Sequence, residues 1–171
     1  NYSSQGPEYA EDAQITIASI TGKNENLIRP RVLKSKEEQQ SRARDKGEVF
    51  TPSWICNSQN NLIDAEWFCQ PEIFNKETDK GWMTNISPIV FPTKDGKTWQ
   101  DYVEDMRLEI TCGEAPYLIS RYDTITGNII PVQDRIGLLD RKLRVVSENT
   151  QTPDEWYDWT TKAYRSIYAF E

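Results

Sequence analysis

The residues best suited to chemistry lie near the middle of the chain, in the stretch RLEITCGEAPYL at 107–118. Apolar and polar residues alternate in LEIT, so the stretch begins like a buried strand, and Gly113 then lets the chain turn. Ligands of doubly wound sheets bind above loops of this kind. The loop lacks the glycines of a dinucleotide site, and Glu114 would repel a phosphate. The stretch therefore favours a phosphate-free, positively charged cofactor such as S-adenosylmethionine, although an ordinary structural turn has the same pattern.

Composition excludes several other kinds of chemistry. The chain of 171 residues has no histidine, which removes Ser-His-Asp triads, Cys-His nucleophiles and histidine-ligated metal sites. Its formal net charge is -7, whereas a stand-alone nucleic-acid binder is normally basic. The charge of the whole chain therefore argues against DNA binding by this chain alone. Hydrophobic residues make up 37% of the chain and include 6 Trp, which indicates a folded domain with a core.

The compartment is predicted from what the sequence lacks. Three scattered cysteines form no disulfide framework, and neither a signal peptide nor an apolar run of about 20 residues is present. We therefore expect a cytoplasmic protein without membrane contact. The chain opens on Asn1 rather than methionine, so we also expect it to be a piece of a longer protein.

The elements that would position this loop begin with a helix-rich region at 15–105, after a loose polar terminus at 1–14. Alternating ITIASI predicts a short strand at 15–20. A capping box of Ser35 and Glu38 predicts a polar helix that ends near Gly47. Seven basic residues dominate this part of the chain: Arg29, Arg31, Lys34, Lys36, Arg42, Arg44 and Lys46. They form either a solvated helix face or a surface for phosphates, in which Arg42 and Arg44 would contact DNA.

A second helix is predicted over 51–68, with Thr51 as its cap and Pro52 at its first position. Its apolar positions, expected on the buried side, are Trp54, Ile55, Leu62 and Ile63. Residues 70–97 have a loop composition, and only PIVF at 88–91 is a candidate strand.

The last part of the chain alternates helices and strands. TWQDYVEDM predicts a short helix at 98–106, and TGN between β-branched residues predicts a hairpin near 122–132. The next helix is marked by helical spacing of Ile136, Leu139, Leu143 and Val146. A capping box of Thr152 and Glu155 starts a final helix, whose inner face would carry Trp156, Trp159 and Ala163. That helix should give way to a strand in SIYAFE, residues 166–171.

Three segments together resemble the DNA adenine methyltransferases of bacterial restriction-modification systems. GEVFTP at 47–52 is similar to their G-x-[FY]-[FY]-T-P segment, and LEITCGEAPYL to their cofactor loop D-P-x-C-G-S-G-x-F-L. SIYAFE resembles the second strand of that fold, which ends on an acid. The sequence departs from the pattern at Glu114 and Ala115, where Ser and Gly are usual.

The resemblance implies an α/β fold, with an incomplete Rossmann-like methyltransferase sheet in 106–171 that forms the first part of an S-adenosylmethionine-binding domain. The implied cofactor-binding residues are Phe50, Thr51, Pro52, Glu109, Gly113 and Glu171. The first three would border the methionine end, the next two would form the pocket floor, and the last would hold the ribose. For the phenylalanine, an ordinary core position is equally compatible with the sequence.

The family's catalytic segment [NDS]-P-P-[YFW] has no counterpart here, because the sequence contains no Pro-Pro pair. In this family the segment accepts hydrogen bonds from the target amine and stacks on a flipped base. We therefore expect a fragment of a DNA methyltransferase that is inactive alone and binds cofactor weakly. The alternative is a non-catalytic module that dimerises or pairs with a second polypeptide through an open sheet edge, or contacts DNA.

Overall fold

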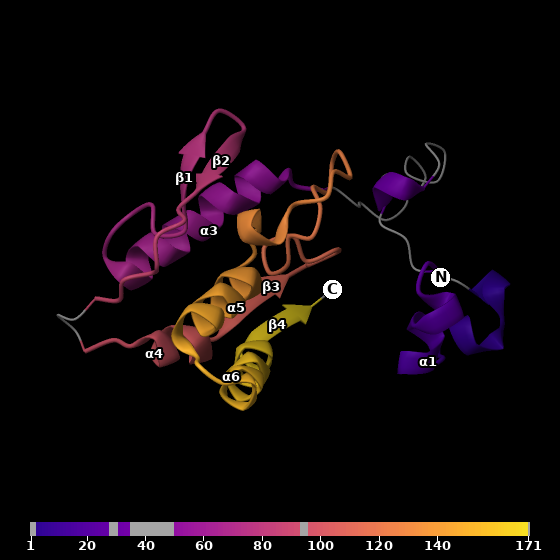
Figure 1. Ribbon diagram of the computed structural model, residues 1–171. Helices are drawn as coiled ribbons and strands as arrows, with labels where there is room; N and C mark the ends of the chain where they lie inside the picture. Colours follow the sequence, from indigo (N-terminus) through magenta and orange to yellow (C-terminus); the bar gives the residue numbers. More distant parts are fainter. Residues whose placement is uncertain (1–2, 28–30, 35–49, 93–95, 171) are drawn as a thin grey trace.

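The computed structural model describes residues 3–27, 31–34, 50–92 and 96–170 and combines helices with two small sheets (Figure 1). The basic helix predicted at 35–47, together with Arg42 and Arg44, lies outside the described residues, as does Glu171.

The described part of the N-terminal region, residues 3–27 and 31–34, contains only short helical turns. They are η1 (Ser3–Gln5), η2 (Pro7–Tyr9), α1 (Ile17–Ile20), η3 (Gly22–Asn24) and η4 (Arg31–Leu33). The strand predicted at 15–20 is therefore wrong. Thr16 Oγ1 accepts a hydrogen bond from Ser19 N–H at 3.2 Å, and Ser19 Oγ accepts one from Thr16 N–H at 3.0 Å. This reciprocal cap starts a helical turn and outweighs the strand preference of the isoleucines.

Helix α3 (Ser53–Phe68) confirms the helix predicted at 51–68, with Pro52 rather than Thr51 at the N-cap. Its orientation differs from the prediction. Leu62 is 70% exposed and Trp54 and Ile63 are also exposed, whereas the buried side carries polar residues spaced by three and four positions. Those buried polar residues are Asn57, Asn60 and Asp64. The helix therefore packs by hydrogen bonding as well as by apolar contact.

The region predicted as loop contains an antiparallel hairpin of β1 (Asn75–Thr78) and β2 (Gly81–Thr84). The strand predicted at 88–91 is wrong. Ile89 is buried in the core, but its N–H donates to Glu148 Oε2 at 2.8 Å instead of to a neighbouring strand. A side-chain acceptor thus replaces a strand partner here.

Three helices predicted in the second half are confirmed: α4 (Trp99–Glu104), α5 (Leu138–Asn149) and α6 (Pro153–Arg165). Thr152 Oγ1 caps α6 by accepting from Glu155 N–H at 3.2 Å, as predicted. The Glu155 carboxylate accepts from Gln151 N–H instead of completing the box at Thr152. The predicted hairpin near 122–132 is reduced to one bridge between Tyr122 and Ile129, followed by η5 (Val132–Asp134).

Strand β3 (Arg107–Ile110) pairs in parallel with β4 (Ile167–Phe170), and α5 and α6 lie in the crossover between them (Figure 1). Both strands were predicted, but β3 is not buried on both faces. Leu108 is 55% exposed and Ile110 is 68% exposed, whereas Glu109 lies on the inner face. The inner face is the one on which Ile167 packs against the core.

The core joins α3, α4, α5 and α6 around aromatic and aliphatic side chains. Its buried members are Phe68, Ile73, Phe74, Ile89, Tyr102, Val103, Leu139, Val145, Val146 and Ala163. Trp159 packs against it as predicted, with its ring centroid 4.6 Å from that of Trp99, whereas Trp156, predicted on the same inner face, is 41% exposed.

A buried ion pair crosses this core. Arg141 Nη1 lies 2.5 Å from Asp64 Oδ2, and Nη2 donates to Asn57 Oδ1 at 2.9 Å. Tyr102 O–H donates to Asp64 Oδ1 at 2.9 Å. Helices α3, α4 and α5 are therefore held in one arrangement by polar groups that hydrogen-bond to one another.

Candidate cofactor site

The loop after β3 carries unusual backbone angles. Thr111, Gly113 and Ala115 have φ values of 54°, 52° and 52°, all in the left-handed region. A non-glycine residue there costs about 1–2 kcal/mol, and such strain is concentrated at functional loops. Gly113 is exposed, and a Cβ at this position would meet no neighbour, so its backbone angle and not lack of space favours glycine. Ala115 adopts a left-handed conformation in which glycine would be less strained. The methyltransferases that the sequence resembles have their second glycine at this position.

The parallel pairing brings this loop to the end of β4. Cys112 N–H donates to Phe170 O at 3.1 Å, so the Cys-Gly pair lies beside the residue that precedes Glu171 in the sequence. Glu109, the acid predicted for the floor, belongs to β3, whereas Glu171, the acid predicted for the ribose, lies outside the described residues.

Glu109 lies under the loop. Burial raises the pKa of its carboxyl to about 7, and hydrogen bonds from the backbone of Leu118 and Tyr117 offset this only in part. Within the described part of the chain, its Oε2 has no hydrogen-bond partner despite being shielded from solvent. A buried acceptor without a donor is rare in folded proteins, and a ligand with a positive charge or a donor group would satisfy it.

The Phe-Thr-Pro segment reaches the same place from α3. Pro52 occupies the N-cap position of the helix. Burial raises the pKa of Tyr117 overall, and a hydrogen bond with Thr51 offsets this in part. Cys56, one turn into α3, also contacts Tyr117, and burial raises the pKa of its thiol to about 12. Phe50 is half-buried at the start of this segment. The structure thus brings Thr51 and Glu109 together around Tyr117, with Pro52 next to Thr51 in the chain.

A turn at residues 122–124, which was not predicted as part of the site, connects the Phe-Thr-Pro segment with the loop after β3. Asp123 Oδ2 accepts from Ser53 N–H at 3.0 Å, and Thr124 Oγ1 donates to Thr51 O at 2.8 Å. Tyr122 O–H donates to Glu114 Oε2 at 3.0 Å in the loop after β3. Three successive residues therefore tie the Phe-Thr-Pro segment to the Cys-Gly loop.

The signal for this turn was present in YDTITGN. An aspartate that precedes Thr-Gly typically accepts hydrogen bonds from the backbone two and three residues later. Asp123 Oδ1 does so from Ile125 N–H at 3.1 Å and Thr126 N–H at 2.7 Å. Its second oxygen, which caps α3 from 70 residues away, could not be foreseen from local sequence.

Two cavities border the turn at residues 122–124. A groove of about 870 Å³ is lined by Pro52 and Asp123 together with residues of the β1–β2 hairpin. A smaller pocket of about 190 Å³ is lined by Glu114 and Tyr122. Of the predicted cofactor-binding residues that the structure describes, Pro52 alone lines either of these two cavities.

Comparison of the chain with protein-family models, curated protein sequences and solved structures finds no match. In the part of the chain that the structure describes, no helix is long and apolar enough to cross a membrane. The same residues contain no cluster of three or more Cys, Asp or Glu side chains that could hold a metal ion.

Proposed function

We propose that this chain forms one wall of an S-adenosylmethionine site in a DNA adenine methyltransferase of a restriction-modification system. The observation that carries the proposal is the hydrogen bond from Cys112 N–H to Phe170 O, 3.1 Å long. It joins the Cys-Gly loop to the end of the neighbouring parallel strand, where ligands of Rossmann-like sheets bind. The open acceptor of Glu109 and the nearby Thr51–Pro52 segment support the same assignment.

The proposed chemistry depends on charge. The cofactor carries an ammonium and a sulfonium, which an ionised carboxylate attracts, whereas Glu114 and Glu109 would repel a polyphosphate. Because the pKa of Glu109 is about 7, this attraction strengthens as the pH rises through neutrality. Methyl transfer itself would need a Pro-Pro-aromatic segment that this sequence does not contain, and DNA contact would use Arg42 and Arg44.

The test is a ¹H–¹⁵N NMR titration of the whole chain with S-adenosylmethionine at pH 6 and pH 8. We expect saturable shifts of the amides of 111–118 and 50–53, tighter binding at pH 8, and no such shifts with ATP. Glu109→Gln should remove the pH dependence, whereas Glu104→Gln, which alters an exposed carboxylate outside the site, should not. Shifts confined to other residues, or equal binding of ATP, would contradict the proposal.

Catalysis and DNA contact are tested separately. With radiolabelled cofactor we expect no methyl transfer to DNA by this chain alone. Measurable transfer would contradict the proposal that this chain supplies only one wall of the cofactor site. Charge reversal of Arg42 and Arg44 should weaken DNA binding and flatten its dependence on salt. Unchanged binding after the reversal would remove these residues from the DNA surface.

A second candidate function is a non-catalytic module that dimerises. The outer face of the β3–β4 pair exposes four large apolar side chains: Leu108 at 55%, Ile110 at 68%, Tyr168 at 44% and Phe170 at 61%. Parallel sheets are normally covered on both faces, so this surface favours association. Light scattering should show a dimer that Ile110→Asp dissociates. A monomer at high protein concentration would eliminate this alternative.

A further inference from the structure

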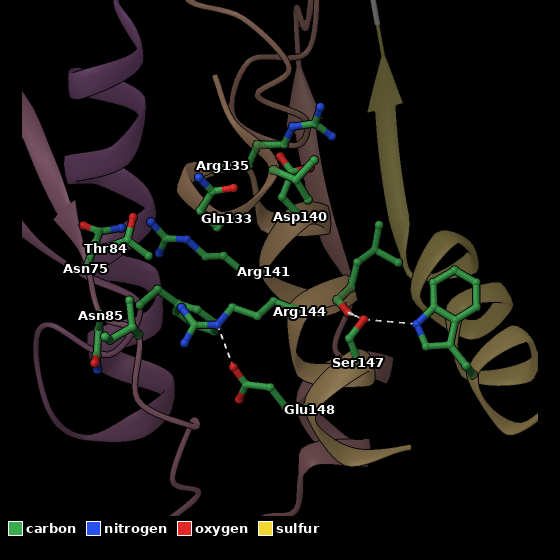
Figure 2. A pocket seen from close by; sticks show the side chains of 15 residues that line it. Asn75, Thr84, Asn85, Gln133, Arg135, Asp140, Arg141, Arg144, Ser147 and Glu148 are labelled. Atoms are coloured by element: carbon green, nitrogen blue, oxygen red, sulfur yellow. Dashed lines mark hydrogen bonds and ion pairs between the residues drawn. The ribbon is translucent and has the colours of Figure 1, made fainter. Parts of the chain in front are cut away.

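A separate cavity of about 530 Å³ lies between α5 and the end of the β1–β2 hairpin (Figure 2). Residues of η5 and Trp156 of α6 complete its lining, and none of Thr51, Pro52, Glu109 and Gly113 contributes to it. Its volume falls in the range of small-molecule sites in proteins. The cavity is therefore independent of the proposed cofactor site.

Guanidinium groups form one wall of this cavity. Figure 2 shows Arg141 and Arg144 reaching from α5 toward the hairpin. Arg141 is 1% exposed and fixed by its ion pair with Asp64. Arg144 donates through Nε to Glu148 Oε1 at 2.7 Å and through Nη2 to Ser87 O at 2.9 Å. Its Nη1 donates to no described residue. The guanidinium of Arg144 is therefore held in place by two acceptors and still has a donor available to a ligand.

Apolar side chains line part of the remaining wall, beside polar ones such as Asn85 and Gln133. Phe74 and Leu143 line the inner part, whereas Ile86 and Val132 are 92% and 74% exposed. The Trp156 ring is oriented by a hydrogen bond from its Nε1–H to Ser147 Oγ at 3.0 Å. Fixed aromatic and aliphatic walls with a few polar groups are typical of sites for flat organic ligands.

The charge balance limits the ligand further. Each arginine of the cavity faces an acid: Arg141 faces Asp64, Arg144 faces Glu148, and Arg135 acts on Asp140. A polyphosphate would find no excess of positive charge here. The Nη1 donor of Arg144 beside apolar side chains suits a single negative charge on a flat ring system.

We propose that this cavity binds a small planar monoanion, an aromatic ring system with one carboxylate, whose oxygen accepts from Arg144 and whose ring packs between Leu143, Val132 and Trp156. The probe is 2-naphthoate, with 2-naphthylmethanol as its neutral analogue. The readout is the indole N–H signal of Trp156 in a ¹H–¹⁵N spectrum of the whole chain, assigned with Trp156→Phe.

We expect saturable shifts at millimolar naphthoate and weaker binding of the alcohol. Arg144→Gln should weaken naphthoate binding by about tenfold or more, the value of a charge-assisted hydrogen bond. Arg165→Gln, on the exposed last turn of α6, is the matched control and should leave binding unchanged.

Ile86 offers a second test that does not depend on the fold, because its side chain is 92% exposed. Ile86→Glu should weaken naphthoate binding and Ile86→Lys should strengthen it, with little change for the alcohol. Equal binding of acid and alcohol, or the same effect of both Ile86 variants, would overturn the proposal. Because the readout needs no S-adenosylmethionine, its result is independent of the proposed function.

Discussion

Replacing Asp123 with alanine should destabilise the protein by removing four hydrogen bonds at once. Its carboxylate accepts from Ser53 N–H at 3.0 Å, Ile125 N–H at 3.1 Å, Thr126 N–H at 2.7 Å and Thr126 Oγ1 at 2.9 Å. A lost N-cap costs about 0.5–2 kcal/mol, and bonds to an ionised acceptor about 1.5–3 kcal/mol each before solvent replaces them. Because Asp123 is partly exposed and water would take over some of the bonds, we expect a loss of about 2–3 kcal/mol.

The effect should depend on pH with a definite sign. Burial alone would raise the pKa of Asp123, but hydrogen bonds from Ser53 and Thr126 lower it below its ordinary value. A lowered folded-state pKa stabilises the fold above the pKa of the unfolded chain, and this contribution is lost as the pH falls through the folded value. Asp123→Asn should therefore be less stable than the natural protein at pH 7, and the difference should shrink below about pH 4.

Urea denaturation at pH 7 and pH 3, followed by tryptophan fluorescence, measures both quantities. Hydrogen exchange provides the local readout: amides of 51–56 and of 112–118 should lose protection together in the variant, because the turn links these segments. Asp154→Asn, at the first turn of α6, is a matched exposed control. A stability difference that stays constant from pH 7 to pH 3, or loss of protection in only one segment, would refute the reasoning.

Three further outcomes are expected. Ala115→Gly should stabilise the protein by about 0.5–1 kcal/mol in urea denaturation, because glycine relieves the positive φ more than it loses in chain entropy. Arg141→Met should destabilise it by about 3–5 kcal/mol, measured the same way, because Asp64 is left charged and buried; unchanged stability would show that the pair is dispensable. Glu109→Gln should be more stable than the natural protein at pH 8 but not at pH 4, because raising the pKa from 4.5 to about 7 on folding costs stability that builds up between these two pH values and is complete above them. Thermal melts at both pH values decide the last point, and a pH-independent difference would contradict it.

Local signals in the sequence predicted most of the helices. Caps such as Thr152, apolar spacing such as that of Leu139 and Val146, and the glycine after LEIT all act within a few residues. The parallel strands were predicted at both ends of the crossover for the same reason, since alternation and breakers need no distant partner. The positions of β3 and β4 could thus be predicted from the chain itself, whereas the α/β class was implied by the family resemblance.

Orientation and pairing were decided by tertiary contacts. Helix α3 turns Asn57 and Asp64 inward and Leu62 outward, because Arg141 on α5 supplies the charge and donors that make polar burial favourable. Glu109 rather than Leu108 faces inward on β3, because the helices of the crossover cover that face.

The candidate site shows the same division. The Phe-Thr-Pro and Cys-Gly segments were recognisable as separate motifs, yet only the fold brings Thr51 and Glu109 together around Tyr117. It does so through Asp123, whose second oxygen caps α3 from 70 residues away. A sequence pattern specifies which groups can accept or donate, whereas the partner of a long-range hydrogen bond depends on packing that the whole chain determines.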